Sequence, residues 1–332
     1  MSLDQHRARP PLSEVAVIVA ARNEAEHLKP CLDSLLIAAR GEAQIIVVDD
    51  ASTDRSLEIL ESYGPRIHVV RSEGKGPGRA RNLGLRAAPR PWIAFTDADC
   101  VVPPDWLSSL LGEIANAAPQ MSSIGGGQEI DRRAGPTERA VGEFLAAAGF
   151  VSDYLHTGNS LSQVDHNPTC NVLYRRSVLE TAGGFDESIW PCEDLDLDLR
   201  LKKMGFRALF HPAAAVEHRR PATCSGFVRM MARYGFAHAQ LAKKHGLCQP
   251  IQFLAFLPLA AAALLFFQKL DGRFYARGFI ATTALLLLFF LLRHRSPFRA
   301  PLSALFAIAS IPAWVFGFYC GLIGSRRIAR HA

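Results

Sequence analysis

The chain lacks any paired cysteine motif. Its 332 residues include seven cysteines, an odd number, with no Cys-x-x-Cys pair and no Cys/His spacing of the kind found in zinc sites. This excludes disulfide-stapled extracellular domains and zinc modules as classes. It also predicts reduced thiols in a cytosolic compartment.

An export signal is also missing from the front of the chain. Residues 1–14 carry charges and prolines but no apolar core of signal-peptide length, so we expect this segment to stay in the cytosol. No nucleic-acid partner is predicted, because the arginines behind the net charge of +6 gather near an apolar tail. Contact with anionic lipid headgroups explains them better.

Apolar residues are concentrated in that tail. Three segments rich in Leu, Ala and Phe occupy residues 251–267, 278–292 and 301–324. A bilayer span takes roughly 20 residues, so the third segment is a good candidate, the first is adequate and the second is short. A buried helical core is the alternative, although few polar residues interrupt the segments. Basic residues flank them at both ends, which leaves their orientation open.

Strand and helix patterns alternate through the first hundred residues. Strands are predicted at 15–20, 44–48, 67–71 and 92–97, and helices at 25–39, 55–63 and 79–88. Such β-α-β units favour a mainly parallel sheet with helices on both faces, an α/β nucleotide-binding fold. Further strands are predicted at 121–131, 171–175 and 208–216, and helices at 177–182 and 193–204. Residues 134–168 are interpreted as a substrate-facing excursion.

Acidic side chains follow two of these strands. Asp97 and Asp99 end the fourth strand, at the edge where open α/β sheets bind ligands. Their oxygens could hold Mg²⁺ or Mn²⁺ against phosphates, although Asp is also common in turns. Asp50 ends the second strand, where it could accept a hydrogen bond from a base or ribose, or cap a helix.

The glycine-rich loop 74–78 lies between a strand and a helix. It fits neither a Walker loop nor a dinucleotide fingerprint. Arg79 and Asn82 follow it at the start of a helix, a position that suits a pyrophosphate.

Three further features are candidates for chemistry. The acidic run from Glu193 contains Asp194 and Asp198, which share a helix face and repel each other, a conflict tolerated more readily where an acid has a function. Such a carboxylate could deprotonate an acceptor hydroxyl. The alternative is that the acidic run simply forms a solvated surface. His218 is a candidate metal ligand or a structural histidine. Arg233 could clamp a diphosphate or meet lipid headgroups.

Six segments, taken together and in this order, closely resemble glycosyltransferase family 2. They are Ala21-Arg22-Asn23-Glu24, Val48-Asp49-Asp50-Ala51-Ser52-Thr53-Asp54, Gly76-Pro77-Gly78-Arg79-Ala80-Arg81-Asn82, Thr96-Asp97-Ala98-Asp99, Gly183-Gly184-Phe185-Asp186-Glu187 and Glu193-Asp194. The resemblance covers about residues 15–234. It implies a GT-A fold, an inverting mechanism, a nucleoside-diphosphate sugar donor with UDP as the expected nucleotide, and a divalent metal, Mg²⁺ or Mn²⁺.

The same resemblance implies roles for single residues. Asp194 would be the general base with Glu193 beside it, and Asp99 would bind the metal. His218 is a candidate further ligand from its position after a predicted strand, independently of the resemblance. The implied contacts to the nucleotide sugar are Ala21, Asn23, Glu24, Asp50 at the nucleobase, Arg79 and Asn82 along the nucleotide, Asp97 near the ribose, and Arg233 at the diphosphate. Processive members carry Gln-x-x-Arg-Trp, which residues 229–234 do not match, and this weighs against polymer synthesis.

The predicted organisation has five parts. They are an N-terminal tail (1–14), a GT-A domain (15–220), an amphipathic interfacial helix (221–250), membrane helices (251–324) and a basic tail (325–332). The predicted protein is a transferase of the inner or cytoplasmic membrane that faces the cytosol and adds a sugar to a lipid or lipid-linked hydroxyl. A polyprenyl-phosphate glycosyltransferase and a non-catalytic sugar-nucleotide-binding scaffold are the alternatives.

Overall fold

The computed structural model describes residues 10–148, 160–259, 283–285, 287–289, 291–292 and 299–324. The chain divides into two compact units. The first unit comprises Met1–Arg132 and Ser152–Arg219, and the second comprises Arg133–Val151 and Arg220–Ala332.

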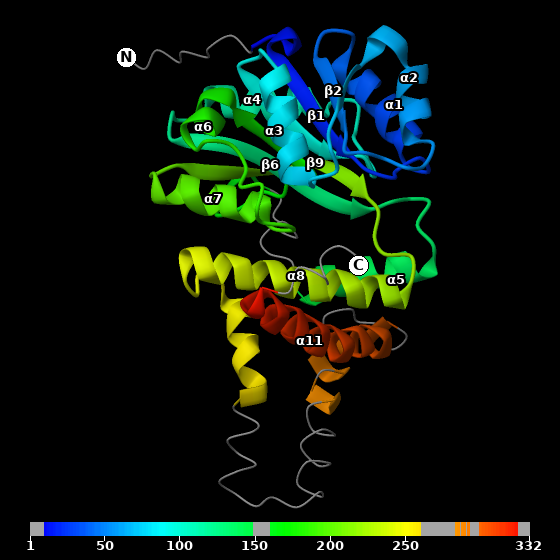
Figure 1. The fold of residues 1–332 in the computed structure, drawn as a ribbon, viewed down its shortest axis with the longest axis vertical. Coiled ribbons are helices and arrows are strands. Elements are labelled where there is room, and N and C mark those ends of the chain that lie inside the picture. Colours follow the sequence, from blue (N-terminus) through cyan, green and yellow to red (C-terminus); the bar gives the residue numbers. More distant parts are fainter. Residues whose placement is uncertain are drawn as a thin grey trace, which may run out of the picture. The chain divides into compact units, whose positions relative to one another are not determined.

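The first unit is built on a mixed sheet (Figure 1). Its described strands are β1 (Val15–Ala21), β2 (Gln44–Asp49), β3 (His68–Arg71), β4 (Trp92–Asp97), β5 (Cys100–Val101), β6 (Met121–Ile130), β7 (Ser162–Val164), β8 (Asn171–Arg175) and β9 (Arg207–His218). They lie in the order β3-β2-β1-β4-β8-β6-β9-β5, and β7 also pairs with β9.

The first four strands pair in parallel, as the alternation of strands and helices predicts. Beyond β4 the sheet becomes mixed, because β8 lies antiparallel between β4 and β6. β9 returns parallel to β6 and antiparallel to the short strand β5. The carboxyl ends of β1, β2 and β4 therefore share one edge of the sheet, the edge at which the predicted site residues cluster.

Helices cover both faces of this sheet. They are α1 (Leu28–Ala39), α2 (Ser56–Ser62), α3 (Pro77–Ala87), α4 (Trp106–Asn116), α6 (Arg176–Thr181) and α7 (Glu193–Lys203). Side chains of β1 alternate between two cores, since Val17 and Val19 pack with α1 and α4 while Ala16 and Ile18 pack with α3 and α7. The sheet is thus buried on both faces, which explains its continuous apolar strands.

The second unit is helical in its described part. It contains α5 (Pro136–Ala148), α8 (Cys224–His245), the 3₁₀ helix η4 (Pro250–Phe256) and α11 (Arg299–Ile323). A Cβ atom on Gly235 of α8 would lie 1.9 Å from the carbonyl oxygen of Trp314, and one on Gly317 of α11 would lie 1.9 Å from that of Ala232. Only glycine allows the two helices to approach this closely.

The predicted membrane segments have different outcomes. Ala300–Ile323 is long and apolar enough to cross a bilayer, with a mean hydropathy of 1.8, in agreement with the segment predicted at 301–324. The segment predicted at 251–267 begins as the shorter apolar helix Pro250–Leu259, and its remainder lies outside the described residues. The segment predicted at 278–292 is described only in part and is helical there.

Some elements were not predicted. The helix α4 and the short strands β5 and β7 have no counterpart among the expected elements. The expected excursion at 134–168 contains α5 and β7, and residues 149–159 within it lie outside the described residues.

We predict that Gly126→Ala destabilises the first unit, because its Cβ would lie 1.9 Å from the backbone oxygen of Ala214 in β9. Overpacking of this kind costs about 1–3 kcal/mol or more, which thermal unfolding would detect. Gly127→Ala is the matched control, since its Cβ meets no atom closer than 3.5 Å. Equal melting temperatures for the two variants would contradict the packing seen between β6 and β9.

Candidate active site

The loops after β1 and β2 are tied together at the sheet edge. The backbone N–H of Asp50 donates to the carbonyl oxygen of Ala21 (2.8 Å). The side-chain oxygen of Asn23 accepts from the backbone N–H of Thr53 (2.8 Å), and the N–H of Glu24 donates to Ser56 Oγ (2.8 Å). The predicted nucleotide-sugar contacts in residues 21–24 therefore also form the joint between two loops.

Asp50 anchors the glycine-rich loop. Its buried carboxylate accepts from the backbone N–H groups of Gly74 (3.1 Å), Lys75 (3.2 Å) and Gly76 (2.8 Å). Gly74 and Gly76 have φ angles of 73° and 99°, which favour glycine. The carboxylate thereby shapes the turn that begins α3, and its predicted contact with a nucleobase stays a prediction.

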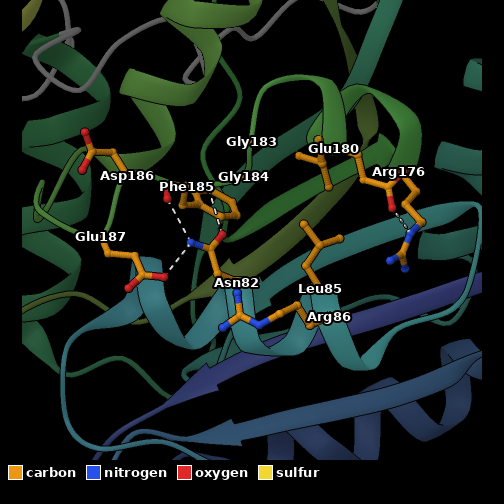
Figure 2. A pocket seen from close by; sticks show the side chains of 11 residues that line it. Asn82, Leu85, Arg86, Arg176, Glu180, Gly183, Gly184, Phe185, Asp186 and Glu187 are labelled. Atoms are coloured by element: carbon orange, nitrogen blue, oxygen red, sulfur yellow. Dashed lines mark hydrogen bonds and ion pairs between the residues drawn. The ribbon is translucent and has the colours of Figure 1, made fainter.

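Asn82 clamps the Gly183–Glu187 loop (Figure 2). Its side-chain amide donates to the carbonyl oxygen of Phe185 (2.9 Å) and to Glu187 Oε1 (3.0 Å), and its Oδ1 accepts from the Phe185 N–H (2.9 Å). Arg79 reaches Glu187 Oε2 at 3.3 Å. A hollow of about 590 Å³ lies beside this clamp. Both predicted nucleotide contacts thus help to hold this loop.

Arg81 connects an acidic residue at the end of β4 with one at the start of α7, and this role was not predicted. Its buried guanidinium donates to Asp97 Oδ1 (2.8 Å) at the end of β4 and to Glu193 Oε1 at the start of α7. Burial opposes its charge, yet the carboxylates of Asp97 and Glu193 hold the pKa of Arg81 above its usual value. A signal was available: Arg81 lies on the buried stripe of α3 with Gly78, Asn82 and Leu85, where an arginine requires an acidic partner.

Glu193 is the more buried of the two predicted catalytic acids. Its Oε2 has no hydrogen-bond partner within the described part of the chain. Burial raises the pKa of Glu193 to about 7, Arg81 lowers it, and Asp194 raises it further. The residue before it, Cys192, has a φ of 90°, a conformation that costs a non-glycine residue energy and is common next to functional side chains.

Asp194 differs from the other acids of α7. Asp196 pairs with Arg200 (2.8 Å), and Asp198 accepts from the Tyr174 hydroxyl (2.8 Å) and contacts His166 Nδ1 (2.8 Å). These partners explain how α7 tolerates its acidic run. Asp194 is half-buried and accepts hydrogen bonds from the backbone N–H groups of Thr169 (3.3 Å) and Leu195 (2.8 Å).

Several carboxylates lie near Glu24. Burial raises the pKa of Glu24 to about 8, and the carboxylates of Asp99 and Asp97 raise it further. A cation bound beside these carboxylates would lower that pKa.

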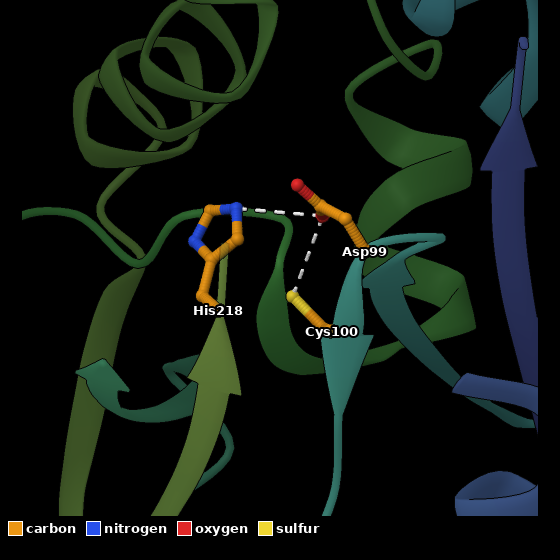
Figure 3. A group of neighbouring side chains, drawn as sticks. All are labelled: Asp99, Cys100 and His218. Carbon is orange, nitrogen blue, oxygen red and sulfur yellow. Dashed lines mark hydrogen bonds and ion pairs between the residues drawn. The ribbon is translucent and has the colours of Figure 1, made fainter. Parts of the chain in front are cut away.

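Asp99 and His218 form a donor set for that cation (Figure 3). His218 Nε2 lies 3.5 Å from Asp99 Oδ1, and His218 Nδ1 lies 2.7 Å from Gln128 Oε1. Since that oxygen only accepts, Nδ1 donates to it, and Nε2 is then the nitrogen that could bind a metal ion from the neutral imidazole. A carboxylate and an oriented imidazole fit a divalent metal ion. Gln128 was not predicted, because its partner is distant in sequence.

Arg233 lies in α8 of the second unit. Burial lowers its pKa. The other predicted site residues all belong to the first unit.

Comparisons with known proteins show the family of the chain. A family model described as glycosyl transferase family 2 matches residues 16–183. The pre-mycofactocin glycosyltransferase of Mycobacterium tuberculosis is 31% identical over 259 residues, which are 71% of this chain and 50% of that protein. The succinoglycan biosynthesis protein ExoO of Rhizobium meliloti is 28% identical over 65% of this chain and 64% of its own length. This chain therefore spans only about half to two thirds of these relatives.

A solved structure has the same fold. The mannosyltransferase PcManGT from Pyrobaculum calidifontis, determined in complex with GDP-Man and Mn²⁺, matches with a TM-score of 0.61 and 22% identity. The match covers 90% of this chain and 87% of that chain, and it confirms the predicted GT-A fold.

We predict that Arg81→Met lowers the free energy of unfolding by about 3–5 kcal/mol at pH 8, because it leaves two carboxylates without their shared cation. Since burial raises the pKa of Glu193, its protonation favours the folded state, and this stability is lost as pH rises through about 7. Without Arg81 that pKa rises further, so the defect should shrink at pH 6.

Chemical denaturation at both pH values measures this effect. Arg86→Met, on the exposed side of the same helix, should change stability by less than about 0.5 kcal/mol. A pH-independent defect in Arg81→Met would argue against the carboxylates as its cause.

Proposed function

Because the chain belongs to glycosyl transferase family 2, we propose that it transfers a sugar, with inversion, from a nucleoside-diphosphate sugar to an acceptor hydroxyl. One observation carries the proposal. The guanidinium of Arg81 contacts both Asp97, two residues before Asp99, and Glu193, the residue before Asp194. A single side chain thus links the strand end that precedes the candidate metal ligand to the helix start that carries the candidate base.

The donor is proposed to lie along the edge formed by β1, β2 and β4. Loops anchored by Asn23, Asp50 and Asn82 lie at this edge, and their fixed conformations support a nucleotide site there. UDP is the expected nucleotide. The same fold holds GDP-Man in PcManGT, so a donor screen should include both UDP-sugars and GDP-sugars.

Asp194 is proposed as the general base. The acceptor oxygen bonds to the anomeric carbon while the bond from that carbon to the diphosphate oxygen breaks, and the hydroxyl proton passes to the Asp194 carboxylate. Glu193 is proposed to position this residue through its contact with Arg81. Because the attack comes from the face opposite the leaving group, the product has inverted configuration.

Asp99 and His218 are proposed to hold Mg²⁺ or Mn²⁺. When bound there, a divalent ion stabilises the negative charge of the departing diphosphate. Gln128 keeps the imidazole of His218 in the tautomer that can bind a metal. Asp97 is proposed to lie on the ribose side, where Arg81 fixes its orientation.

The acceptor is proposed to be a lipid or lipid-linked sugar at the cytosolic face of the inner or cytoplasmic membrane. The apolar helix Ala300–Ile323 supports membrane association. Basic residues Lys243 and Lys244 at the end of α8 suit anionic headgroups. Arg233 is proposed to contact the diphosphate or a headgroup phosphate.

Replacing the proposed base tests the chemistry. Asp194→Asn should lower kcat by about 10²–10⁴-fold with little change in donor KM, since the amide cannot accept the proton. Transfer is measured as nucleoside-diphosphate release in detergent with a membrane lipid extract.

Asp165→Asn is the matched control, because this exposed carboxylate pairs with the exposed Lys202 at the surface. Full activity of Asp194→Asn would remove the base assignment and favour an acceptor phosphate, which needs no base.

The metal assignment predicts that a chelator abolishes release and that Mn²⁺ or Mg²⁺ restores it. Gln128→Leu should weaken Mn²⁺ binding by about 10–100-fold, as is typical when a metal-binding histidine loses its orienting partner. Isothermal titration measures this binding directly. Glu129→Gln, an exposed neighbour, should bind Mn²⁺ normally. Chelator-resistant release would contradict the assignment.

A further inference from the structure

The candidate metal site contains a third donor of different chemistry. Asp99, Cys100 and His218 each offer one ligand atom, and these oxygen, sulfur and nitrogen atoms all lie within 4.8 Å of one another (Figure 3). Hard ions such as Mg²⁺ use oxygen ligands, whereas thiolates select softer ions such as Zn²⁺. A sulfur atom is therefore unexpected beside a site for Mg²⁺.

We propose that Cys100 is a ligand for soft divalent ions and that the Asp99–Cys100–His218 group is a Zn²⁺ site which competes with Mg²⁺ or Mn²⁺. Zn²⁺ bound there would inhibit transfer, a consequence that rests on the proposed function.

The distances fit a tetrahedral ion. Zn–S bonds of about 2.3 Å and Zn–N or Zn–O bonds of about 2.0–2.1 Å place the ligands about 3.4–3.6 Å apart at tetrahedral angles. Asp99 Oδ1 lies 3.5 Å from His218 Nε2 and 3.9 Å from Cys100 Sγ. The third pair, Cys100 Sγ and the imidazole nitrogen, lies within 4.8 Å, so shifts of about 1 Å or less would complete the coordination.

The fold brings the three donors together. β5 pairs antiparallel with β9 so that Cys100 lies opposite His218, and Asp99 directly precedes Cys100. Gln128 holds the far nitrogen of the imidazole at 2.7 Å, which fixes the near nitrogen toward the other two donors. Three ligands with an orienting partner leave a fourth position for water or for a phosphate oxygen of the donor.

The difference between ions lies in the thiol. Zn²⁺ displaces the thiol proton to solvent and bonds to the thiolate, whereas Mg²⁺ and Mn²⁺ bind oxygen and nitrogen donors and leave the thiol protonated. Removing the sulfur should therefore affect soft ions far more than hard ones.

The experiment compares the purified full chain with its Cys100→Ser variant. Both carry Cys224→Ser, which removes an exposed thiol. Cd²⁺ titration reports thiolate ligation through its ultraviolet charge-transfer absorbance, and isothermal titration gives Zn²⁺ and Mn²⁺ affinities. We expect Cys100→Ser to lose the absorbance of one thiolate. It should also bind Zn²⁺ at least about tenfold more weakly, because losing a residue that only orients a ligand already weakens metal binding by about 10–100-fold. Mn²⁺ affinity should stay unchanged.

Cys320→Ser is the control, because this free thiol belongs to the second unit and lies outside the donor group. If Cys100→Ser does not fold, X-ray absorption spectroscopy of the chain without this substitution, loaded with one equivalent of Zn²⁺, tests whether sulfur binds the ion. A zinc shell that contains sulfur is expected, and a shell without sulfur overturns the inference.

The outcomes separate this inference from the proposed function. Equal Zn²⁺ affinity and absorbance in Cys100→Ser, with Mn²⁺-dependent transfer intact, would overturn the role of Cys100 alone. A thiolate-bound zinc in a chain that neither binds Mn²⁺ nor transfers sugar would overturn the proposed function and support the zinc site.

Discussion

The buried guanidinium of Arg81 is the interaction on which the arrangement of the site depends. It neutralises two carboxylates that belong to different elements, Asp97 on β4 and Glu193 on α7. Its helix lies close to the sheet because position 84 is glycine: a Cβ there would lie 2.4 Å from Ile18 Cγ2. Asn82, the residue after Arg81, holds the Gly183–Glu187 loop. Packing of α3 on the sheet thus sets where Arg81 meets the carboxylates of Asp97 and Glu193.

The polar residues of the site fall into two groups. Asn23, Asp50 and Asn82 have their hydrogen-bonding groups engaged by neighbouring loops, and such satisfied contacts make the framework rigid. Asp194 accepts hydrogen bonds from the backbone N–H groups of Thr169 and Leu195. A preorganised frame favours transition-state stabilisation, because the frame need not reorganise during the reaction.

The sequence predicted the elements whose signal is local. β1 to β4 and α7 follow from runs of apolar residues and helical spacing, and their observed bounds differ by a few residues. Contacts between distant residues had no such signal. Arg81 meets partners 16 and 112 positions away, and β5 has two residues, too few for any period. The helix α4 did carry helical spacing, and its omission was an error of interpretation.

The metal end of the site depends on strand register rather than on any motif. β6 and β9 change register between Gly126 and Gln128, and beyond this irregularity Gln128 pairs with Val216, two residues before His218. Side chains two residues apart share a face of the sheet, so the imidazole and its orienting amide face each other. A slip of one residue would turn one of them to the opposite face. The backbone contact that only Gly126 permits therefore helps to set the register that brings the Gln128 amide to the imidazole of His218.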